Sequence, residues 1–168
     1  MQEYTSNSKE ETQKIASNFA KSLKGGEVLC FYGNLGTGKT TFIQSLAKAL
    51  GVKENVTSPT YVLIKKYKTA NKKSIPSKKV VAKNIQYPIS NIQFFYHMDA
   101  YRLGSSQEAL DLGLEEIWND PANIIAIEWA DKISDILPKN KIDLCFVYPE
   151  PSRGKHIEGD KRKITIFN

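Results

Sequence analysis

Cysteine is scarce in this chain of 168 residues, and long apolar runs are missing from it. The two cysteines, Cys30 and Cys145, each lie inside a short apolar run, so core packing is their expected role. A disulfide framework or a cysteine-rich zinc site is excluded on this count. No apolar run approaches the roughly 20 residues that span a bilayer. Residues 1–8 are polar and lack the apolar region of a signal peptide. We therefore expect a cytoplasmic protein that makes no use of a membrane.

Acidic residues are missing from one stretch and crowded into another. Residues 65–83 hold eight lysines and no acid, and without those charges the formal net charge of +6 becomes −2. Residues 108–135 hold eight acids against Lys132 alone. The chain is thus polarised and not uniformly basic, which argues against general nucleic-acid binding. Residues 68–91 are predicted to form a long lysine-rich loop or weak hairpin with one strand-like patch at residues 80–82. A solvated, self-repelling loop is the favoured interpretation, and a phosphate-binding arm is the alternative.

Glycine is concentrated at one place, where residues 33–40 read G-x-x-x-x-G-K-T. This is the phosphate-binding loop of the P-loop NTPases. A triphosphate needs several backbone N–H donors at once, and Gly33, Gly36 and Gly38 leave room for that approach. Lys39 brings a positive charge to the β- and γ-phosphate oxygens, and the hydroxyl of Thr40 is a magnesium ligand.

The segments on both sides of the glycine-rich motif support a nucleotide site over an incidental turn. Residues 28–32 form an apolar run typical of a buried strand, and apolar side chains recur at helical spacing between residues 42 and 50. Gly51 then provides a helix stop. Upstream, residues 8–11 read as a capping box with Ser8 as N-cap, which opens an earlier helix that ends at residues 25–26.

Two further apolar runs each end in an acid. Residues 92–98 precede Asp99, and residues 123–127 precede Glu128. An acid at the end of a buried strand is where P-loop enzymes place the carboxylate that holds magnesium or orients water. The second run has the pattern of a Walker B element, so Glu128 is the leading metal-ligand candidate and Asp99 the next. His97 is expected to be a packed strand residue and not a metal ligand, because no second histidine or cysteine lies nearby.

Two more patterns near the predicted site have competing interpretations. Ser58 and Thr60 flank a proline after the P-loop helix, where such proteins often place a hydroxyl that senses the γ-phosphate or magnesium. A polar turn before a strand at residues 61–64 explains the same residues equally well. Residues 140–143 match N-K-x-D, a guanine-recognition motif, but Asp143 precedes a strand-like run instead of following one. We therefore reject the GTPase interpretation.

Together the motifs resemble the TsaE family, the small bacterial ATPases of tRNA threonylcarbamoyladenosine (t6A) biosynthesis. The resemblance rests on G-N-L-G-T-G-K-T-T-F, then S-P-T-Y, H-M-D-A-Y-R-L, I-E-W and L-P, in this order over nearly the whole chain. It implies an α/β P-loop NTPase fold, with a mostly parallel mixed sheet flanked by helices in a single domain over residues 1–168. It also implies hydrolysis of ATP with Mg²⁺, in an assembly with TsaD and TsaB that modifies adenosine 37 of tRNA.

The resemblance also implies roles for individual residues. The implied catalytic residues are Lys39, Thr60, Asp99 and Glu128, and the implied metal site is Thr40, Asp99 and Glu128. The implied nucleotide-binding residues are Thr12, Gly33, Asn34, Leu35, Gly36, Thr37, Gly38, Lys39, Thr40 and Thr41. Trp129 matches the aromatic residue that follows the Walker B acid.

Two departures from the family pattern leave positions open. The lysine-rich segment is longer than the usual connector, so its contact with tRNA is not inherited from the resemblance. Arg153 and Arg162 compete for the place of the family's nucleotide-contacting arginine.

The alternative function is a P-loop kinase acting on a small molecule of the nucleoside-monophosphate type, although it would need an arginine-rich lid. A nucleotide-dependent adaptor without hydrolysis is a third class.

Overall fold

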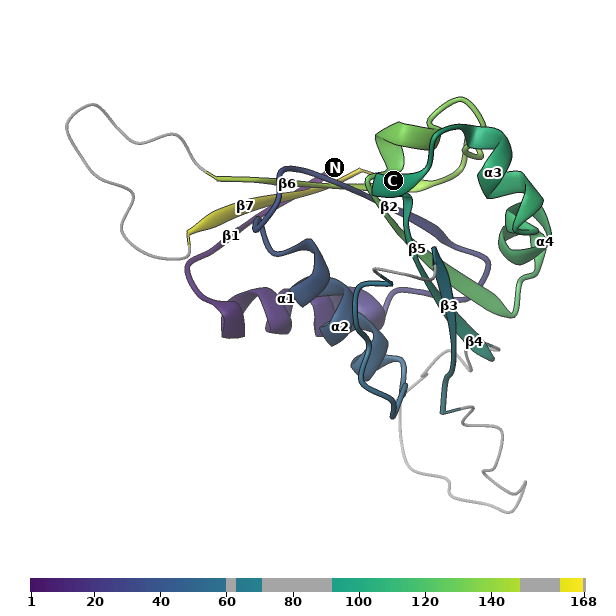
Figure 1. The fold of residues 1–168 in the computed structure, drawn as a ribbon. Coiled ribbons are helices and arrows are strands. Elements are labelled where there is room, and N and C mark those ends of the chain that lie inside the picture. Colours follow the sequence, from purple (N-terminus) through teal and green to yellow (C-terminus); the bar gives the residue numbers. More distant parts are fainter. Residues whose placement is uncertain (60–62, 71–91, 149–160, 168) are drawn as a thin grey trace, which may run out of the picture.

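The computed structural model describes residues 1–59, 63–70, 92–148 and 161–167. Within these residues seven strands form one sheet in the order β1-β7-β6-β2-β5-β4-β3 (Figure 1). The strands are β1 (Gln2–Ser6), β2 (Val28–Tyr32), β3 (Ile64–Lys68), β4 (Phe94–Asp99), β5 (Asn123–Glu128), β6 (Ile142–Val147) and β7 (Arg162–Phe167). The helices are α1 (Lys9–Ala20), α2 (Lys39–Ala49), α3 (Ser106–Asp111) and α4 (Leu114–Asn119), with short 3-10 turns η1 (Ala100–Arg102) and η2 (Ala130–Ile133).

The centre of the sheet is parallel and its edges are antiparallel. Strands β6, β2, β5 and β4 run parallel, whereas β3 pairs antiparallel with β4, β7 with β6, and β1 with β7. The predicted α/β fold with a mixed sheet is therefore confirmed. In the register, Glu128 lies opposite both Phe31 and Asp99, so the carboxyl ends of β2, β5 and β4 meet at one edge. In sheets of this kind that edge carries the ligand site.

Helices cover both faces of the sheet, with α1 and α2 on one face and α3 and α4 on the other (Figure 1). The side chains of β2 alternate between the two cores: Leu29 and Phe31 join one apolar cluster, and Val28 and Cys30 join the other. Burial on both faces explains why this strand is apolar throughout. Phe42 of α2 packs against the ring of Phe31 at 5.8 Å between centroids, which fixes the helix after the phosphate loop onto the strand before it.

The predicted helix signals are confirmed at the start of α1 and at the end of α2, whereas α1 ends at Ala20, before the predicted stop at residues 25–26. Ser8 is the N-cap of α1, and its hydroxyl accepts a hydrogen bond from the backbone N–H of Glu11. The Glu11 carboxylate bonds to the N–H of Asn7, one residue earlier than a capping box requires. Beyond α2, Gly51 has a left-handed φ of 88° and its N–H bonds to the carbonyl of Lys48.

Three elements differ from the sequence prediction. The polar N-terminus forms β1, because pairing with β7 satisfies its backbone groups without an apolar side-chain pattern. Of the strand predicted at residues 61–64, residues 61–62 lie outside the described part and Leu63 precedes β3, which contains Lys65, Lys66 and Lys68. Lysine suits this position because β3 is an edge strand, where charged side chains block further pairing. The apolar face that continues past Gly113 is divided there between α3 and α4, since Gly113 adopts φ 75°.

Some predictions lie outside the described residues: Thr60, Arg153, the patch at residues 80–82 and most of the lysine-rich segment. In the described parts of the chain, no helix has the length and apolar character needed to cross a membrane.

Candidate nucleotide and metal site

The loop between β2 and α2 has a backbone that only glycine can adopt at two points. Gly33 has φ 129°, and a Cβ there would lie 2.2 Å from the carbonyl oxygen of Phe146. Gly38 has φ 99°, and a Cβ there would lie 2.6 Å from Nη1 of Arg162. Left-handed backbone with no free space requires glycine. The loop can therefore turn tightly and present its N–H groups at the N-terminus of α2, where helix geometry favours an anion.

Lys39 is held by the carbonyls of the loop it follows. Its Nζ donates to the carbonyl oxygens of Gly33 at 2.6 Å and Asn34 at 2.9 Å. The hydroxyl of Thr37 donates to the same Asn34 carbonyl at 2.8 Å. These bonds keep the ammonium group inside the curve of the loop, where the phosphates of a nucleotide would lie. Leu35, by contrast, is exposed at the tip of the loop.

An aromatic ring and several acids surround the ammonium group of Lys39. Its Nζ lies 4.6 Å from the ring centroid of Trp129, a cation–π distance. Trp129 is held in the left-handed region at φ 58°, and its ring packs against Tyr101 with 5.1 Å between centroids. Burial lowers the pKa of Lys39, and the negative charges of Glu128, Asp99 and Asp131 offset part of that decrease. This is an environment in which an added phosphate charge would favour the protonated amine.

Thr40 and Glu128 are joined directly. The Thr40 hydroxyl lies 3.0 and 3.1 Å from the two carboxylate oxygens of Glu128, to which it donates. Nε2 of His97 lies 2.9 Å from Oε1 of the same carboxylate, and the His97 side chain is fully buried. The structure therefore brings the P-loop hydroxyl and the strand-end acid together, as the sequence predicted.

Asp99 lies beside Glu128 in the sheet and has partners of its own. Its Oδ2 accepts a hydrogen bond from the hydroxyl of Ser58 at 2.9 Å, and its Oδ1 accepts from the backbone N–H of Tyr101 at 3.1 Å. Ser58 is thus brought to the candidate site, which favours its predicted role near the phosphates over a polar turn alone. Thr60, the other hydroxyl of that prediction, lies outside the described residues.

The donor set fits a magnesium ion. The hydroxyl of Thr40 and the carboxylates of Glu128 and Asp99 are hard oxygen donors, the kind that Mg²⁺ prefers. No group of three or more histidine, cysteine, aspartate or glutamate side chains that could hold a metal occurs in the described ranges. Mg²⁺ in nucleotide sites is usually held by one or two carboxylates together with phosphates and water. Two carboxylates and a hydroxyl are therefore sufficient.

The remaining predicted residues lie around this centre in different ways. Thr41 is partly buried in the first turn of α2. Thr12 is fully buried, and its hydroxyl lies 2.7 Å from that of Ser6. Ser6 of β1 in turn pairs with Arg162 of β7. Because Arg162 lies against Gly38, Thr12 is connected to the phosphate loop through two neighbouring strands.

Sequence reasoning missed two contacts of the site. The hydroxyl of Tyr148, just after β6, donates to the carbonyl of Gly36 at 2.8 Å and braces the loop. An aromatic residue at the carboxyl end of a strand next to β2 was the available signal. His97 was predicted to be a packing residue, and its burial agrees, but its bond to Glu128 depends on the pairing of β4 with β5.

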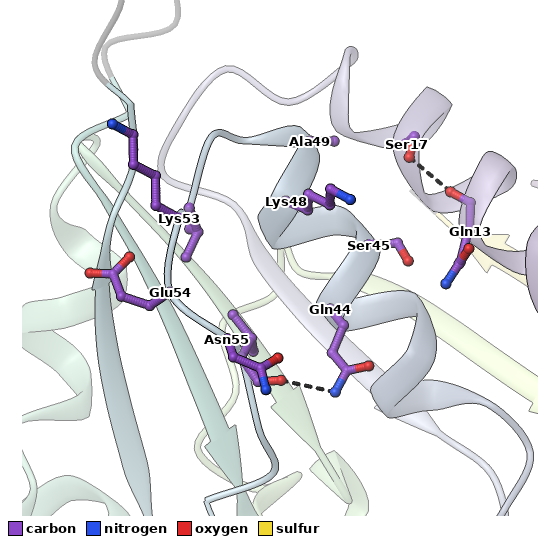
Figure 2. Close-up of a pocket in the computed structure, with 11 residues that line it drawn as sticks. Gln13, Ser17, Gln44, Ser45, Lys48, Ala49, Lys53, Glu54 and Asn55 are labelled. Carbon is purple, nitrogen blue, oxygen red and sulfur yellow. Dashed lines mark hydrogen bonds between the residues drawn. The ribbon is translucent and has the colours of Figure 1, made fainter.

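A hollow of about 740 Å³ lies between α1, α2 and the segment after α2 (Figure 2). Its lining is mostly polar and contains none of the site residues predicted from the sequence. Within it, Nε2 of Gln44 donates to the carbonyl of Val56 at 2.9 Å. This bond ties the helix that follows the phosphate loop to the segment that carries Ser58.

The N-K-x-D match overlaps the amino end of β6, where Asp143 is the second residue, so it does not lie at the carboxyl end of a strand. The Asp143 carboxylate accepts hydrogen bonds from the hydroxyl of Tyr32 at 3.0 Å and from Lys141 at 2.6 Å. Nearby, burial raises the pKa of the Cys30 thiol to about 12, so this cysteine is unreactive and packs in the core.

We expect Asp143→Ala to leave ATP affinity unchanged, because the carboxylate is engaged away from the loop. Loss of its partly exposed ion pair with Lys141 should lower the free energy of unfolding by about 0–1 kcal/mol. Competition of GTP against labelled ATP measures the nucleotide affinity, and melting of the variant measures its stability. A large loss of nucleotide binding, or GTP displacing ATP preferentially, would revive the guanine interpretation.

Comparison with known proteins adds an independent finding. The family model described as threonylcarbamoyl adenosine biosynthesis protein TsaE matches residues 6–157. The tRNA threonylcarbamoyladenosine biosynthesis protein TsaE of Rickettsia prowazekii (strain Madrid E) is 36% identical over 164 residues, which is 97% of this chain and 92% of that protein. The protein of the same name from Bacillus subtilis (strain 168) is 34% identical over 157 residues, or 94% of this chain and 79% of that protein.

A solved structure is similar as well. The crystal structure of Bacillus subtilis YdiB matches with a TM-score of 0.64 and 27% sequence identity, covering 98% of this chain and 83% of that one. The similarity in sequence and in fold thus extends over nearly the whole chain.

Proposed function

The chain belongs to the TsaE family, and we propose that it is the ATP-binding and ATP-hydrolysing component of a tRNA N6-threonylcarbamoyladenosine modification system. The observation that carries this proposal is the group formed by Lys39, Thr40 and Glu128. A phosphate-loop lysine, the adjacent hydroxyl and a strand-end carboxylate lie together where three parallel strands end. Such a group suits a nucleoside triphosphate better than any other common ligand.

Binding begins with the loop. The backbone N–H groups of residues 33–38 and the N-terminus of α2 surround the phosphates, while Lys39 moves its bonds from the loop carbonyls to phosphate oxygens. In hydrolysis, a water oxygen attacks the γ-phosphorus and the bond to the β–γ bridging oxygen breaks, which leaves ADP and inorganic phosphate. Lys39 stabilises the negative charge that develops on the β- and γ-phosphate oxygens during this step.

Thr40, Glu128 and Asp99 are the residues that we propose to hold Mg²⁺. When bound, the ion neutralises charge on the β- and γ-phosphate oxygens. Glu128 is buried at the end of β5 and keeps a fixed direction. Asp99 is oriented by Ser58 and the Tyr101 backbone, and these two hydrogen bonds support a role for its carboxylate in binding the metal or the attacking water.

The segment from Val56 to Ser58 connects the chemistry to the rest of the molecule. Gln44 of α2 bonds to its start and Asp99 to its end, so a change at either residue shifts the loop. We propose that this loop, continuing to Thr60, responds to the γ-phosphate and changes the surface offered to partners. Loops of this kind are ordered by a γ-phosphate and released after hydrolysis.

Arg162 is the arginine that we propose to contact the nucleotide. It is buried in β7 and lies against Gly38 of the phosphate loop. A guanidinium group at this place can bond to phosphate through two nitrogens. Its competitor, Arg153, lies outside the described residues.

The partners that we propose are TsaD and TsaB, with tRNA engaged through the assembly in the cytoplasm. Family membership supports this assignment. Two unpaired cysteines among the described residues agree with a reducing compartment. Direct contact of the lysine-rich segment with tRNA stays a prediction. Of the eight lysines in residues 65–83, Lys65, Lys66 and Lys68 lie in the described strand β3.

Phosphate release from ATP in the presence of Mg²⁺ tests the proposed function. We expect slow release by the chain alone and faster release once TsaD and TsaB are added. Nucleoside monophosphates should accept no phosphoryl group under the same conditions. A phosphorylated acceptor would identify a kinase, and nucleotide binding without release in every mixture would identify a non-hydrolysing adaptor.

A further inference from the structure

Among the residues that the structure describes, His97 is a buried side chain that is hydrogen-bonded to Glu128 and that the proposed chemistry does not use. It lies on β4 with none of its side chain exposed, and Nε2 is 2.9 Å from Oε1 of Glu128. The other ring nitrogen, Nδ1, is buried and has no hydrogen-bond partner in the described part of the protein. The contact with Glu128 is thus the ring's only polar contact among these residues.

Packing alone does not account for an imidazole at this position. Phe95, two residues earlier on β4, points to the same face of the sheet and fills the core with a purely apolar ring. A polar ring in such surroundings carries a desolvation cost that only a hydrogen bond offsets. Here the bond goes to the carboxylate that faces the phosphate loop. Because an ionised carboxylate only accepts, a hydrogen bond between these two groups requires the tautomer in which the Nε2–H of His97 donates to Glu128.

Nucleotide binding affects the two hydrogen-bond partners of Glu128, Thr40 and His97, in different ways. Thr40 donates its hydroxyl proton to Glu128, yet the same oxygen is the proposed metal ligand. Reorienting that hydroxyl weakens its hold on the carboxylate. The bond from His97 comes from the core side and is not needed elsewhere, so it can hold Glu128 in both situations.

We propose that His97 is a positioning residue that fixes the Glu128 carboxylate for Mg²⁺–nucleotide binding. The inference rests on the proposed function, since it assigns His97 a part in that same site. Second-layer partners of this type orient a ligand and raise metal affinity, and losing one typically costs about 10- to 100-fold.

The test uses the full chain and reads binding, not turnover. The binding of a fluorescent ATP analogue is titrated at increasing Mg²⁺ for the parent, His97→Leu, His97→Gln and Phe95→Leu. We expect His97→Leu to need about 10- to 100-fold more Mg²⁺ for half-maximal binding, with unchanged affinity in the absence of Mg²⁺. His97→Gln, which can place an amide N–H near the position of Nε2, should recover most of the loss. Phe95→Leu should lower the melting temperature without shifting the Mg²⁺ requirement.

A double-mutant cycle separates positioning from packing. In a Glu128→Gln background, His97→Leu should cause little further shift in the Mg²⁺ requirement, because its route of action is already removed. Equal shifts in both backgrounds would overturn the proposal, as would a His97→Leu variant that behaves like the parent. Binding by the parent that does not depend on Mg²⁺ would also overturn the proposal, whereas a parent that binds no nucleotide at all would refute the proposed function instead.

A measurement on the unaltered histidine covers the case in which His97→Leu does not fold. The chain has two histidines, so ¹⁵N labelling gives few side-chain signals. We expect His97 to carry a proton on Nε2. The ¹⁵N chemical shift of this nitrogen should change in Glu128→Gln and stay constant in Phe95→Leu. A bare Nε2, or a signal indifferent to Glu128→Gln, contradicts the proposal.

Discussion

Replacing Lys39 with alanine is expected to lower the rate of ATP hydrolysis by at least about 100-fold, the usual effect of losing one preorganised charge-stabilising group. The ammonium group is held inside the loop by two carbonyls and faces the position of the phosphates. Its removal also leaves the carboxylates of Glu128 and Asp99 without the nearby positive charge that now balances them. Nucleotide binding should weaken together with the rate, because the lysine contacts phosphate in the ground state as well.

Lys48→Ala is the matched control for this experiment. Lys48 lies on the same helix, nine residues after Lys39, but it is exposed in the last turn of α2. The charge change is identical, whereas the phosphate contact is absent. Phosphate release and analogue binding are measured for both variants beside their melting temperatures. Hydrolysis by Lys39→Ala at the parent rate would show that the active site lies elsewhere.

The sequence was sufficient to predict which residues meet at the centre of the candidate site, because each of the signals is local. The glycines at positions 33, 36 and 38 are required by the left-handed backbone angles of a single turn. Glu128 and Asp99 each end an apolar run, and parallel strands place such ends at one edge of the sheet without further information. The predicted α/β fold follows from the same alternation of apolar strands and amphipathic helices.

The parts that could not be predicted depend on pairing between distant segments. Strand β1 has a polar sequence and exists because β7 offers it backbone partners. The competition between Arg153 and Arg162 could not be decided from spacing, since proximity to Gly38 follows from the position of β7 in the sheet. His97 has no local signal that distinguishes a packed ring from one bonded to Glu128 on the neighbouring strand.

The second large effect is expected at Glu128, where replacement by glutamine should preserve nucleotide binding and lower hydrolysis by about 100-fold or more. Glutamine keeps the shape of the side chain, so the fold and the contact region of Thr40 are retained. It lacks the negative charge that the proposed metal site requires, and binding of the nucleotide rests mainly on the phosphate loop. Analogue binding and phosphate release at saturating Mg²⁺ give the two quantities, and Glu116→Gln on the exposed surface of α4 controls for the change in charge.

Asp99→Asn completes this prediction, because Asp99 pairs with Glu128 across the two strands but differs in its contacts. The amide oxygen of asparagine can still accept from the hydroxyl of Ser58 or from the N–H of Tyr101, so the loop should keep its position. Hydrolysis should again fall while nucleotide affinity stays near that of the parent. Normal turnover in both Glu128→Gln and Asp99→Asn would mean that neither strand-end acid serves the reaction. Loss in Glu128→Gln alone would confine the metal site to Thr40 and Glu128 and leave Asp99 with the structural task of holding Ser58.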